Sequence, residues 1–235
     1  MKRGTPIEDA LLTVVMPVYN EKATIEEIVS RVLAVPVRKE LVAVDDASTD
    51  GTREVLQRLG RERGFTVLLQ ERNQGKGAAV RRGIAAAQGH VVVVQDADLE
   101  YSPEEYPDLL ELIVRGKADA VYGSRFIGRH RCFLFSHYLA NLFLNTVTNV
   151  LYNTTMTDME TCFKAIRTDV LRGITLRSDR FGIEPEITAK LFKAGARVYE
   201  VPITYDGRDY SEGKKITWKD GFPALWTLVK YRFVD

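Results

Sequence analysis

Cysteine is scarce in this chain, and its placement excludes two common kinds of stabilising site. Cys132 and Cys162 form no Cys-x-x-Cys pair and have no histidine at metal-ligand spacing, so we predict buried thiols in a reducing compartment and no zinc centre. Long apolar runs are also lacking. No segment approaches the roughly 18 uninterrupted apolar residues of a membrane-spanning helix, and residues 1–12 lack the apolar core of a signal peptide. We therefore expect a cytoplasmic chain that does not itself span a membrane.

The sequence also has no excess of charge of either sign. Lys and Arg number 33 and Asp and Glu number 32 in 235 residues, for a formal net charge of +1. Without a broad basic surface the chain does not fit a general nucleic-acid binder, and we expect no nucleic-acid partner. There is no internal repeat or convincing linker, and the length suffices for one α/β domain with a large core. We therefore predict a single domain over residues 1–235.

Apolar runs alternate with helical stretches through the first hundred residues. Short runs at 11–15, 41–44, 67–69 and 91–94 each precede a polar segment and, in the first three cases, a stretch that reads as a helix. This order predicts an α/β fold with a doubly wound, mostly parallel sheet and right-handed crossovers. Sheets of this kind bind ligands beyond the carboxyl ends of their strands.

The pattern is less regular after residue 100. Ser102 and Pro103 predict a helix start with a serine cap and a proline in the first turn, and 120–122 predicts a short strand. Residues 137–152 predict an apolar helix that carries one polar stripe, made of Asn141, Asn145 and Asn149. Core packing explains most of its apolar surface, whose breadth leaves room for contact with lipid.

Two carboxylates, Asp96 and Asp98, follow the buried run at 91–94. At the carboxyl end of a central strand they offer hard oxygen ligands to Mg²⁺ or Mn²⁺, which suits a metal-bridged phosphate. The alternative is a strand-ending turn in which both acids cap backbone amides. The other motifs of the chain favour the metal site.

The first two strand ends suit a nucleobase. Pro17 and Tyr19 can form one wall of a slot for the base, and the Asp46 carboxylate can accept a hydrogen bond from a base N–H. The alternative, that Asp45, Asp46 and Ser48 cap the following helix, does not account for consecutive acids at a strand end.

The turn Gly75-Lys76-Gly77 lacks the spacing of a P-loop. Lys76 and the amides at the start of the next helix could nevertheless lie near donor phosphates. A tight turn onto a helix, without a ligand, is the alternative.

A second acidic pair, Asp158 and Glu160, lies beyond the long helix. An acceptor hydroxyl needs a base, whereas an acceptor phosphate is already an anion and needs only positioning and desolvation. We therefore expect Asp158 to orient the acceptor or the sugar, and to act as a base only if a proton must be removed. The alternative is a capped turn that leads into residues 163–166.

Binding of a diphosphate or an acceptor phosphate needs basic residues to balance the negative charge. Arg125 follows a predicted strand, while Arg208, Lys214 and Lys215 lie in a polar, glycine-punctuated stretch that is typical of a mobile loop. Such groups can close over a diphosphate or an acceptor phosphate. A solvated surface loop is the alternative.

The C-terminal segment, residues 218–235, is aromatic and basic. It can lie in a bilayer interface with its rings at headgroup depth and its cations towards anionic lipid. Packing against the sheet or against a dimer partner explains it equally well.

Taken in order, these motifs resemble the signature of family-2 inverting glycosyltransferases over about residues 12–220. The motifs are Val15–Glu21, Val44–Thr52, Asn73–Gly77 and Asp96–Asp98. Two later segments, Asp158–Ala165 and Arg180–Glu186, resemble the branch that contains dolichyl-phosphate mannose synthases and polyprenyl-phosphate glucosyltransferases.

The resemblance implies a GT-A-like fold and a nucleotide diphosphate sugar, GDP-mannose or UDP-glucose, as donor. It implies that Mg²⁺ or Mn²⁺ is bound mainly through Asp98, with Asp96 and Glu100 as further ligands, and that Asp46 and Glu21 lie by the base. Residues 11–125 would then form the donor half and 126–217 the acceptor half.

The acceptor implied by this branch is a polyprenyl or dolichyl monophosphate, with Arg125 and Arg208 at its phosphate and Lys214 and Lys215 at the donor. Many relatives continue into transmembrane helices, so we expect a chain that stops at Asp235 to dock on the cytoplasmic face of the membrane or to recruit a separate membrane subunit. The alternatives are a family-2 enzyme that acts on a glycan or other hydroxyl, and a catalytically silent nucleotide-sugar-binding subunit.

Overall fold

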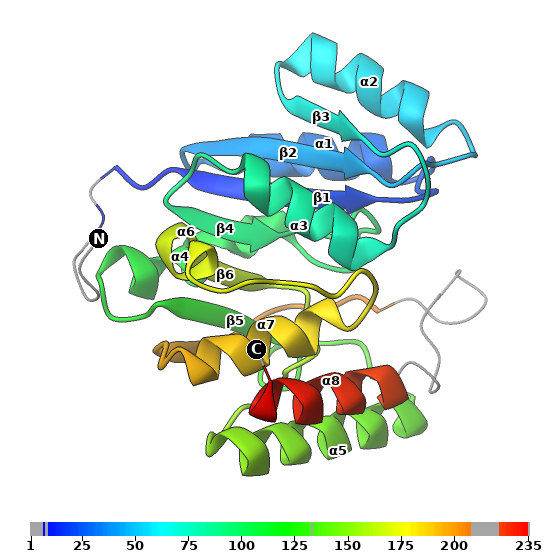
Figure 1. Ribbon diagram of the computed structural model, residues 1–235. Coiled ribbons are helices and arrows are strands. Elements are labelled where there is room, and N and C mark those ends of the chain that lie inside the picture. Colours follow the sequence, from blue (N-terminus) through cyan, green and yellow to red (C-terminus); the bar gives the residue numbers. More distant parts are fainter. Residues whose placement is uncertain (1–6, 8, 133, 208–220, 235) are drawn as a thin grey trace.

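The computed structural model describes residues 7, 9–132, 134–207 and 221–234. Within these residues the strands are β1 Leu12–Val18, β2 Lys39–Asp45, β3 Thr66–Leu69, β4 Val91–Val94, β5 Ala120–Ser124, β6 Lys164–Arg167 and β7 Val198–Pro202. They form one seven-stranded sheet in the order β3-β2-β1-β4-β6-β5-β7 (Figure 1).

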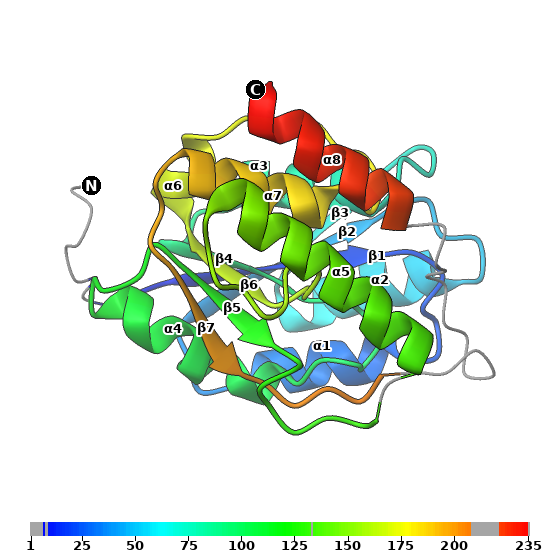
Figure 2. The ribbon, with the colours of Figure 1, turned by 90° about the horizontal axis from the view of Figure 1, so that it is seen from below.

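Helices cover both faces of this sheet. They are α1 Ile25–Ala34, α2 Thr52–Arg63, α3 Lys76–Ala86, α4 Tyr106–Val114, α5 Phe135–Tyr152, α6 Thr168–Arg172, α7 Ile183–Lys193 and α8 Gly221–Phe233, with a short 3-10 turn, η1, at Pro103–Glu105. Figure 2 shows α1 and α4 on one side of the sheet and α3 and α7 on the other, with α5 and α8 packed side by side beyond α7.

The sheet is mostly parallel, as predicted. Strands β1 to β4 pair in parallel, as do β5 and β7, whereas β6 lies antiparallel between β4 and β5. The predicted α/β fold is therefore confirmed, and the four apolar runs of the first hundred residues are strands of its parallel half.

Two strands were not predicted. In β6 the charged residues Lys164 and Arg167 are each 1% exposed, so the strand has no continuous apolar run that would reveal it. In β7 no residue is fully buried, because this strand lies at the edge of the sheet. An edge strand with mixed burial gives a weak periodic signal.

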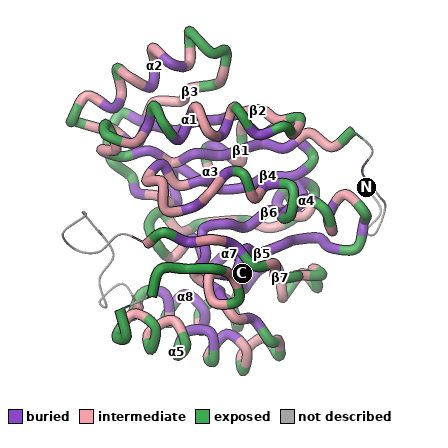
Figure 3. The backbone as a smooth tube through the Cα atoms, turned by 180° about the vertical axis from the view of Figure 1, so that it is seen from behind, coloured by how far each residue is buried: buried purple, intermediate pink, exposed green. Residues whose placement is uncertain are grey.

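The core lies along the parallel half of the sheet. All four residues of β4 are buried, and so is nearly all of β1. Figure 3 shows this buried centre between half-exposed helices. Strands buried on both faces need an apolar residue at every position, which explains the continuous valine run.

Two details of the sequence analysis were wrong. Cys132 is exposed, so only Cys162 is a buried thiol. The hydroxyl of Ser102 makes no cap hydrogen bond to η1; it accepts a hydrogen bond from Arg31 Nη2 at 3.3 Å instead.

The final helix, α8, packs against α7 and α5. Ala224, Leu228 and Tyr231 are buried, whereas Trp226 and Phe233 are exposed. Packing explains its inner face and leaves an apolar outer face. Among the helices the structure describes, none combines the length and apolar character needed to cross a membrane.

Helix α3 lies unusually close to β1 because Gly83 has no side chain. A Cβ at this position would lie 2.3 Å from Val15 Cγ1, whereas one at Gly221 would have nothing within 4 Å. We predict that Gly83→Ala lowers the free energy of unfolding by about 1–3 kcal/mol through overpacking. Urea denaturation should show no such loss for the control Gly221→Ala, and equal stability of the two variants would contradict this packing.

Candidate active site

The loops that follow β1 and β2 are joined by hydrogen bonds at the carboxyl edge of the sheet. The backbone N–H of Asn20 donates to Ser48 Oγ at 3.0 Å, and the N–H of Thr49 donates to Asn20 Oδ1 at 2.8 Å. Asn20 has a positive φ of 54°, which an asparagine tolerates better than most residues. The two loops therefore form one rigid edge beside β1 and β2.

Three predicted donor-binding residues lie on this edge. Pro17 is half-buried at the end of β1, opposite Val44, and Tyr19 is exposed. Glu21 is half-buried, and its backbone N–H donates to Thr52 Oγ1 at 3.0 Å. Their position suits a slot for a nucleobase, and their contacts with a donor remain predictions.

Asp46 stabilises the turn before α3, a role that was not predicted from the sequence. Its side chain is buried; Oδ1 accepts hydrogen bonds from Gln70 Nε2 at 2.6 Å and from the N–H of Gln74 at 2.7 Å. Oδ2 accepts from the N–H of Gly75 at 2.7 Å. The carboxylate therefore acts as the anion at the start of α3. Its predicted contact with a base N–H remains untested.

Asp45 is buried for a different reason. Its Oδ2 lies 2.6 Å from Arg53 Nε, and the same guanidinium donates to the carbonyl of Gln70. Oδ1 accepts the N–H of Ser48 at 3.3 Å. The consecutive acids thus both anchor loops, Asp45 through an ion pair and Asp46 through amides.

Lys76 joins α3 to the end of β4. Its Nζ lies 2.9 Å from each carboxylate oxygen of Asp96 and 3.5 Å from Glu184 Oε1. Burial alone would lower the pKa of Lys76, but the charges of Asp96 and Glu184 outweigh burial and hold this pKa well above its ordinary value. Lys76 is therefore an ammonium ion at the site.

Several backbone amides at and just before the start of α3 have hydrogen-bond partners inside the protein. Those of Gln74 and Gly75 donate to Asp46, and the N–H of Ala78 donates to the carbonyl of Asp179 at 3.0 Å. The expectation that amides of this turn, with Lys76, lie near donor phosphates stays a prediction. The Lys76 side chain contacts Asp96, which follows β4.

The three predicted metal ligands differ in their surroundings. Asp96 pairs with Lys76; Asp98 Oδ1 accepts the N–H of Glu100 at 3.2 Å; and Glu100 Oε2 accepts the hydroxyl of Tyr205 at 2.8 Å. Across the described ranges, no group of three or more His, Cys, Asp or Glu side chains is arranged to hold a metal ion. Asp96, Asp98 and Glu100 do not form such a group in this structure, and their role as metal ligands stays a prediction.

The residues present still fit a divalent ion of the predicted kind. Asp96 and Asp98 are half-buried carboxylates at the end of a buried strand. Mg²⁺ is commonly held by one or two carboxylates, with substrate phosphates and water completing the shell. The donor set of this chain suits such an ion, and Asp98 remains its predicted main ligand.

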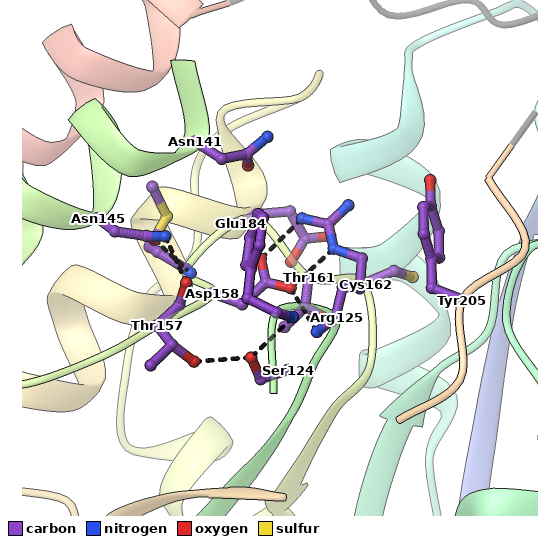
Figure 4. A network of polar contacts seen from close by, with 12 residues as sticks. Ser124, Arg125, Asn141, Asn145, Thr157, Asp158, Thr161, Cys162, Glu184 and Tyr205 are labelled. Atoms are coloured by element: carbon purple, nitrogen blue, oxygen red, sulfur yellow. Dashed lines mark hydrogen bonds and ion pairs between the residues drawn. The ribbon is translucent and has the colours of Figure 1, made fainter. Parts of the chain in front are cut away.

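Arg125 and Asp158 form a buried ion pair with two parallel hydrogen bonds (Figure 4). Arg125 Nε and Nη2 each lie 2.7 Å from an Asp158 oxygen, and the backbone N–H of Arg125 adds a third contact at 2.9 Å. Burial opposes the positive charge of Arg125, but Asp158 outweighs it and the pKa of Arg125 is well above its ordinary value. Asp158 therefore positions Arg125, which argues against its use as a base.

The polar stripe of α5 holds the loop that carries this acid. Asn145 Oδ1 accepts the N–H of Met159 at 2.8 Å, and Asn149 Oδ1 accepts the N–H of Met156 at 2.8 Å. From the opposite side, the Glu200 carboxylate accepts the N–H of Asp158 at 3.0 Å. The four-residue spacing of the asparagines was the sequence signal for this support, but it gave no indication of what they bind.

Glu160 is the acid with the least satisfied carboxylate in this loop. Its Oε1 atom is buried and has no hydrogen-bond partner among the described residues, and the same holds for Thr161 Oγ1. Burial raises the pKa of Glu160 to about 7, although Lys164 and Arg125 partly oppose this shift. A carboxyl group of this kind can take up or release a proton near neutral pH.

The donor and acceptor sides meet at Tyr205. Its hydroxyl donates to Glu100, and its ring centroid lies 5.2 Å from the guanidinium carbon of Arg125. Tyr205, Lys164, Glu184 and Glu200 were not predicted as site residues. The predicted phosphate-binding residues Arg208, Lys214 and Lys215 lie outside the described residues.

The chain is similar to known proteins over most of its length. Residues 13–175 match the model of the family described as glycosyl transferase family 2. Over 209 residues the chain is 34% identical to a dolichol-phosphate mannosyltransferase of Pyrococcus furiosus, covering 86% of this chain and 58% of the relative. It is 30% identical to an undecaprenyl-phosphate mannosyltransferase of Micrococcus luteus, with 85% of each chain covered.

A third relative is a dodecaprenyl-phosphate galacturonate synthase of Rhizobium johnstonii, 29% identical over 90% of this chain and 64% of that protein. The chain thus spans less than two thirds of the Pyrococcus and Rhizobium relatives. Among solved structures, a Mycobacterium tuberculosis glucosyl-3-phosphoglycerate synthase with Mn²⁺, UDP and product superimposes with a TM-score of 0.74 at 20% identity, covering 96% of this chain and 81% of that one.

The fold and the family match define the class of protein. The chain belongs to glycosyltransferase family 2, and the predicted GT-A-like fold is confirmed. Its named relatives act on polyprenyl phosphates, as the branch resemblance of the later motifs predicted.

Because Asp46 accepts hydrogen bonds inside the protein, we predict that its substitution lowers the free energy of unfolding even without a ligand. Asp46→Asn places an amide against donors that need an acceptor, so we expect about 1–3 kcal/mol less stability in urea without any nucleotide. Glu54, an exposed acid of α2, provides the control Glu54→Gln, which should be close to neutral. Wild-type stability of Asp46→Asn would show that its carboxylate does not hold the turn.

Glu160 predicts a pH dependence of stability. Its pKa is about 7 in the folded protein, against 4.5 ordinarily, so the folded state binds this proton more tightly. Its stabilising contribution is complete below pH 4.5 and is lost as the pH rises through 7. Relative to Glu160→Gln, the wild type should lose about 1–3 kcal/mol between pH 4.5 and 7.5 in urea titrations.

The control for this measurement is Glu71→Gln, since Glu71 is exposed. Its stability should follow the wild type at every pH. Parallel curves for wild type and Glu160→Gln would contradict the assignment.

Proposed function

We propose that the protein transfers a hexose, with inversion, from a nucleotide diphosphate sugar, GDP-mannose or UDP-glucose, to a polyprenyl or dolichyl monophosphate. The observation that carries the proposal is the position of Tyr205, whose hydroxyl contacts Glu100 and whose ring lies beside Arg125. One side chain thus contacts both Glu100, an acid that follows β4, and Arg125, the cation proposed for the acceptor side. The named relatives support the choice of substrates.

On the donor side, Pro17, Tyr19 and Glu21 would bind the base, and Lys76 would meet the diphosphate. Mg²⁺ or Mn²⁺ would be held by Asp98 with Asp96, and when bound it would neutralise charge on the departing nucleotide. Solved family neighbours that contain Mn²⁺ or Mg²⁺ with UDP support this use of a divalent ion.

On the acceptor side, Arg125 would bind the phosphate of the lipid. Asp158 accepts from Nε and Nη2 of Arg125, so Nη1 is the part of the guanidinium that can meet an acceptor. Because a phosphate is already an anion, no base is needed, and Glu160 in its protonated form can donate a hydrogen bond to it. Exclusion of water around the buried ion pair strengthens these contacts.

Apolar surface near Arg125 suits an isoprenoid acceptor. A cavity of about 220 Å³ between α5 and the following loop is lined by the side chains of Phe126, Tyr138, Leu142 and Met156 together with the polar residues Asn145, Thr146, Asn149 and Thr157. Beyond it, Phe135 is 72% exposed on α5 and Trp226 67% exposed on α8. We propose that this apolar face docks on the cytoplasmic surface of a membrane or on a membrane subunit.

The decisive assay offers labelled nucleotide sugars together with a short-chain polyprenyl phosphate, with and without EDTA. We expect organic-extractable hexose that requires both the lipid phosphate and the metal. Asp98→Ala should lower turnover by at least about 100-fold, with an unchanged unfolding curve. The control Asp108→Ala removes an exposed acid of α4 and should keep full activity. Full activity of Asp98→Ala at saturating donor and metal would refute its role.

One observation favours a second candidate, transfer to a hydroxyl of a glycan or another soluble acceptor. The Glu160 carboxylate has an unpartnered, buried oxygen and a pKa of about 7, which suits a general base. Activity on water-soluble acceptors, without any need for lipid phosphate and abolished by Glu160→Gln, would select this alternative.

A further inference from the structure

A chain of alternating charges connects the donor side with the acceptor loop. It runs from Asp96 through Lys76 and Glu184 to Lys164, whose Nζ donates to the carbonyl of Thr161. Glu184 stands at its centre, with Oε1 3.5 Å from Lys76 Nζ and Oε2 2.6 Å from Lys164 Nζ. Figure 4 draws Glu184 together with Thr161 and Arg125.

These charges come from separate parts of the fold. Lys76 starts α3, Asp96 follows β4, Lys164 starts β6 and Glu184 lies in the first turn of α7. Glu184 and Lys164 are both buried, with side chains 7% and 1% exposed. Burying an ion pair is costly and is commonly no better for stability than apolar packing. A buried network of this kind is therefore a candidate for a positional role in function.

A neighbouring pair provides the contrast. Glu186 and Lys190, on the same helix, are also buried and lie 2.7 Å apart. Glu186 accepts hydrogen bonds from the backbone N–H groups of Arg177 and Ser178. Among the residues that the structure describes, the hydrogen bonds and the ion pair of Glu186 involve neither Asp96 nor the loop of Glu160. The two glutamates thus have similar burial and similar pairing but different targets.

We propose that Glu184 is a positioning residue that sets how tightly Lys76 holds Asp96, and so how readily Asp96 helps to bind a divalent ion with the donor diphosphate. Through Lys164, the same carboxylate fixes Thr161 beside Glu160. This inference rests on the proposed function, because it takes Asp96 as a ligand on the donor side.

The sign of the effect follows from the charges. Glu184 draws the Lys76 ammonium away from Asp96, so loss of its charge tightens the Lys76–Asp96 pair. A tighter pair competes with a divalent ion for the Asp96 oxygens. Loss of the Lys164 charge should weaken the Lys76–Asp96 pair. Without that charge, Lys76 is the lysine that remains paired with Glu184, and Glu184 attracts it more strongly.

The test is calorimetric titration of GDP and of UDP into the full chain over a range of Mn²⁺ concentrations. We expect Glu184→Gln to need about tenfold more Mn²⁺ than the wild type for half-maximal nucleotide binding, a change typical of coupled sites. Lys164→Gln should need less Mn²⁺ than the wild type. The control Glu186→Gln should match the wild type in Mn²⁺ requirement even if it lowers the unfolding temperature.

The outcomes separate this inference from the proposed function. Equal Mn²⁺ requirements for Glu184→Gln and Glu186→Gln would overturn the role of Glu184, as would a shift of Lys164→Gln towards higher Mn²⁺. If Glu184→Gln fails to fold, the direction of the Lys164→Gln shift still decides. A wild type that binds neither nucleotide at any Mn²⁺ concentration would refute the proposed function, and this inference with it.

Discussion

A carboxylate that is removed from water must find cations or hydrogen-bond donors inside the protein, and this requirement shapes both halves of the site. Asp46 meets it with the amides of the turn before α3. Asp158 pairs with the guanidinium of Arg125, and Glu184 pairs with Lys76 and Lys164. Each buried acid therefore fixes a segment whose other groups can face a substrate.

Function follows from where the sheet places these segments. The loops after the parallel strands β1, β2 and β4 lie at one edge of the sheet, where Asp96, which follows β4, contacts Lys76. The antiparallel strand β6 then brings the loop of Asp158 and Glu160 to the same region, and β5 leads into Arg125. Tyr205 touches both sides. A transferase needs this proximity, because the donor sugar and the acceptor must meet at one carbon atom.

The sequence predicted the parallel half of the fold well, because strands buried on both faces are continuous apolar runs and are followed by polar loops. It failed for β6, where Lys164 and Arg167 are buried through pairing with Glu184 and Asp169. An apolar pattern does not reveal such a strand, since Lys164 is buried against Glu184, 20 residues away, and Arg167 against Asp169, two residues away. The edge strand β7 was missed because its burial is mixed.

The roles of the site residues stay predictions, but the structure shows what several of these residues contact. Motif order located the acids and the family, but spacing alone could not distinguish a carboxylate that holds the fold from one that faces a ligand. Asp158 forms an ion pair with Arg125, 33 residues away in the sequence. Glu160, two residues after Asp158, has an oxygen without a hydrogen-bond partner among the described residues. The Asp46 carboxylate likewise accepts hydrogen bonds from backbone amides about 28 residues away in the sequence. Those assignments depend on tertiary contacts.

The central claim is that a divalent ion joins the acids after β4 to the diphosphate of a nucleotide. The most direct measurement is anomalous X-ray diffraction from crystals grown with Mn²⁺ and GDP or UDP. The account predicts one strong manganese peak at coordination distance from the Asp98 carboxylate and from both phosphates. A bound nucleotide with its manganese elsewhere, or with Asp96 and Asp98 turned away from the diphosphate, would contradict it.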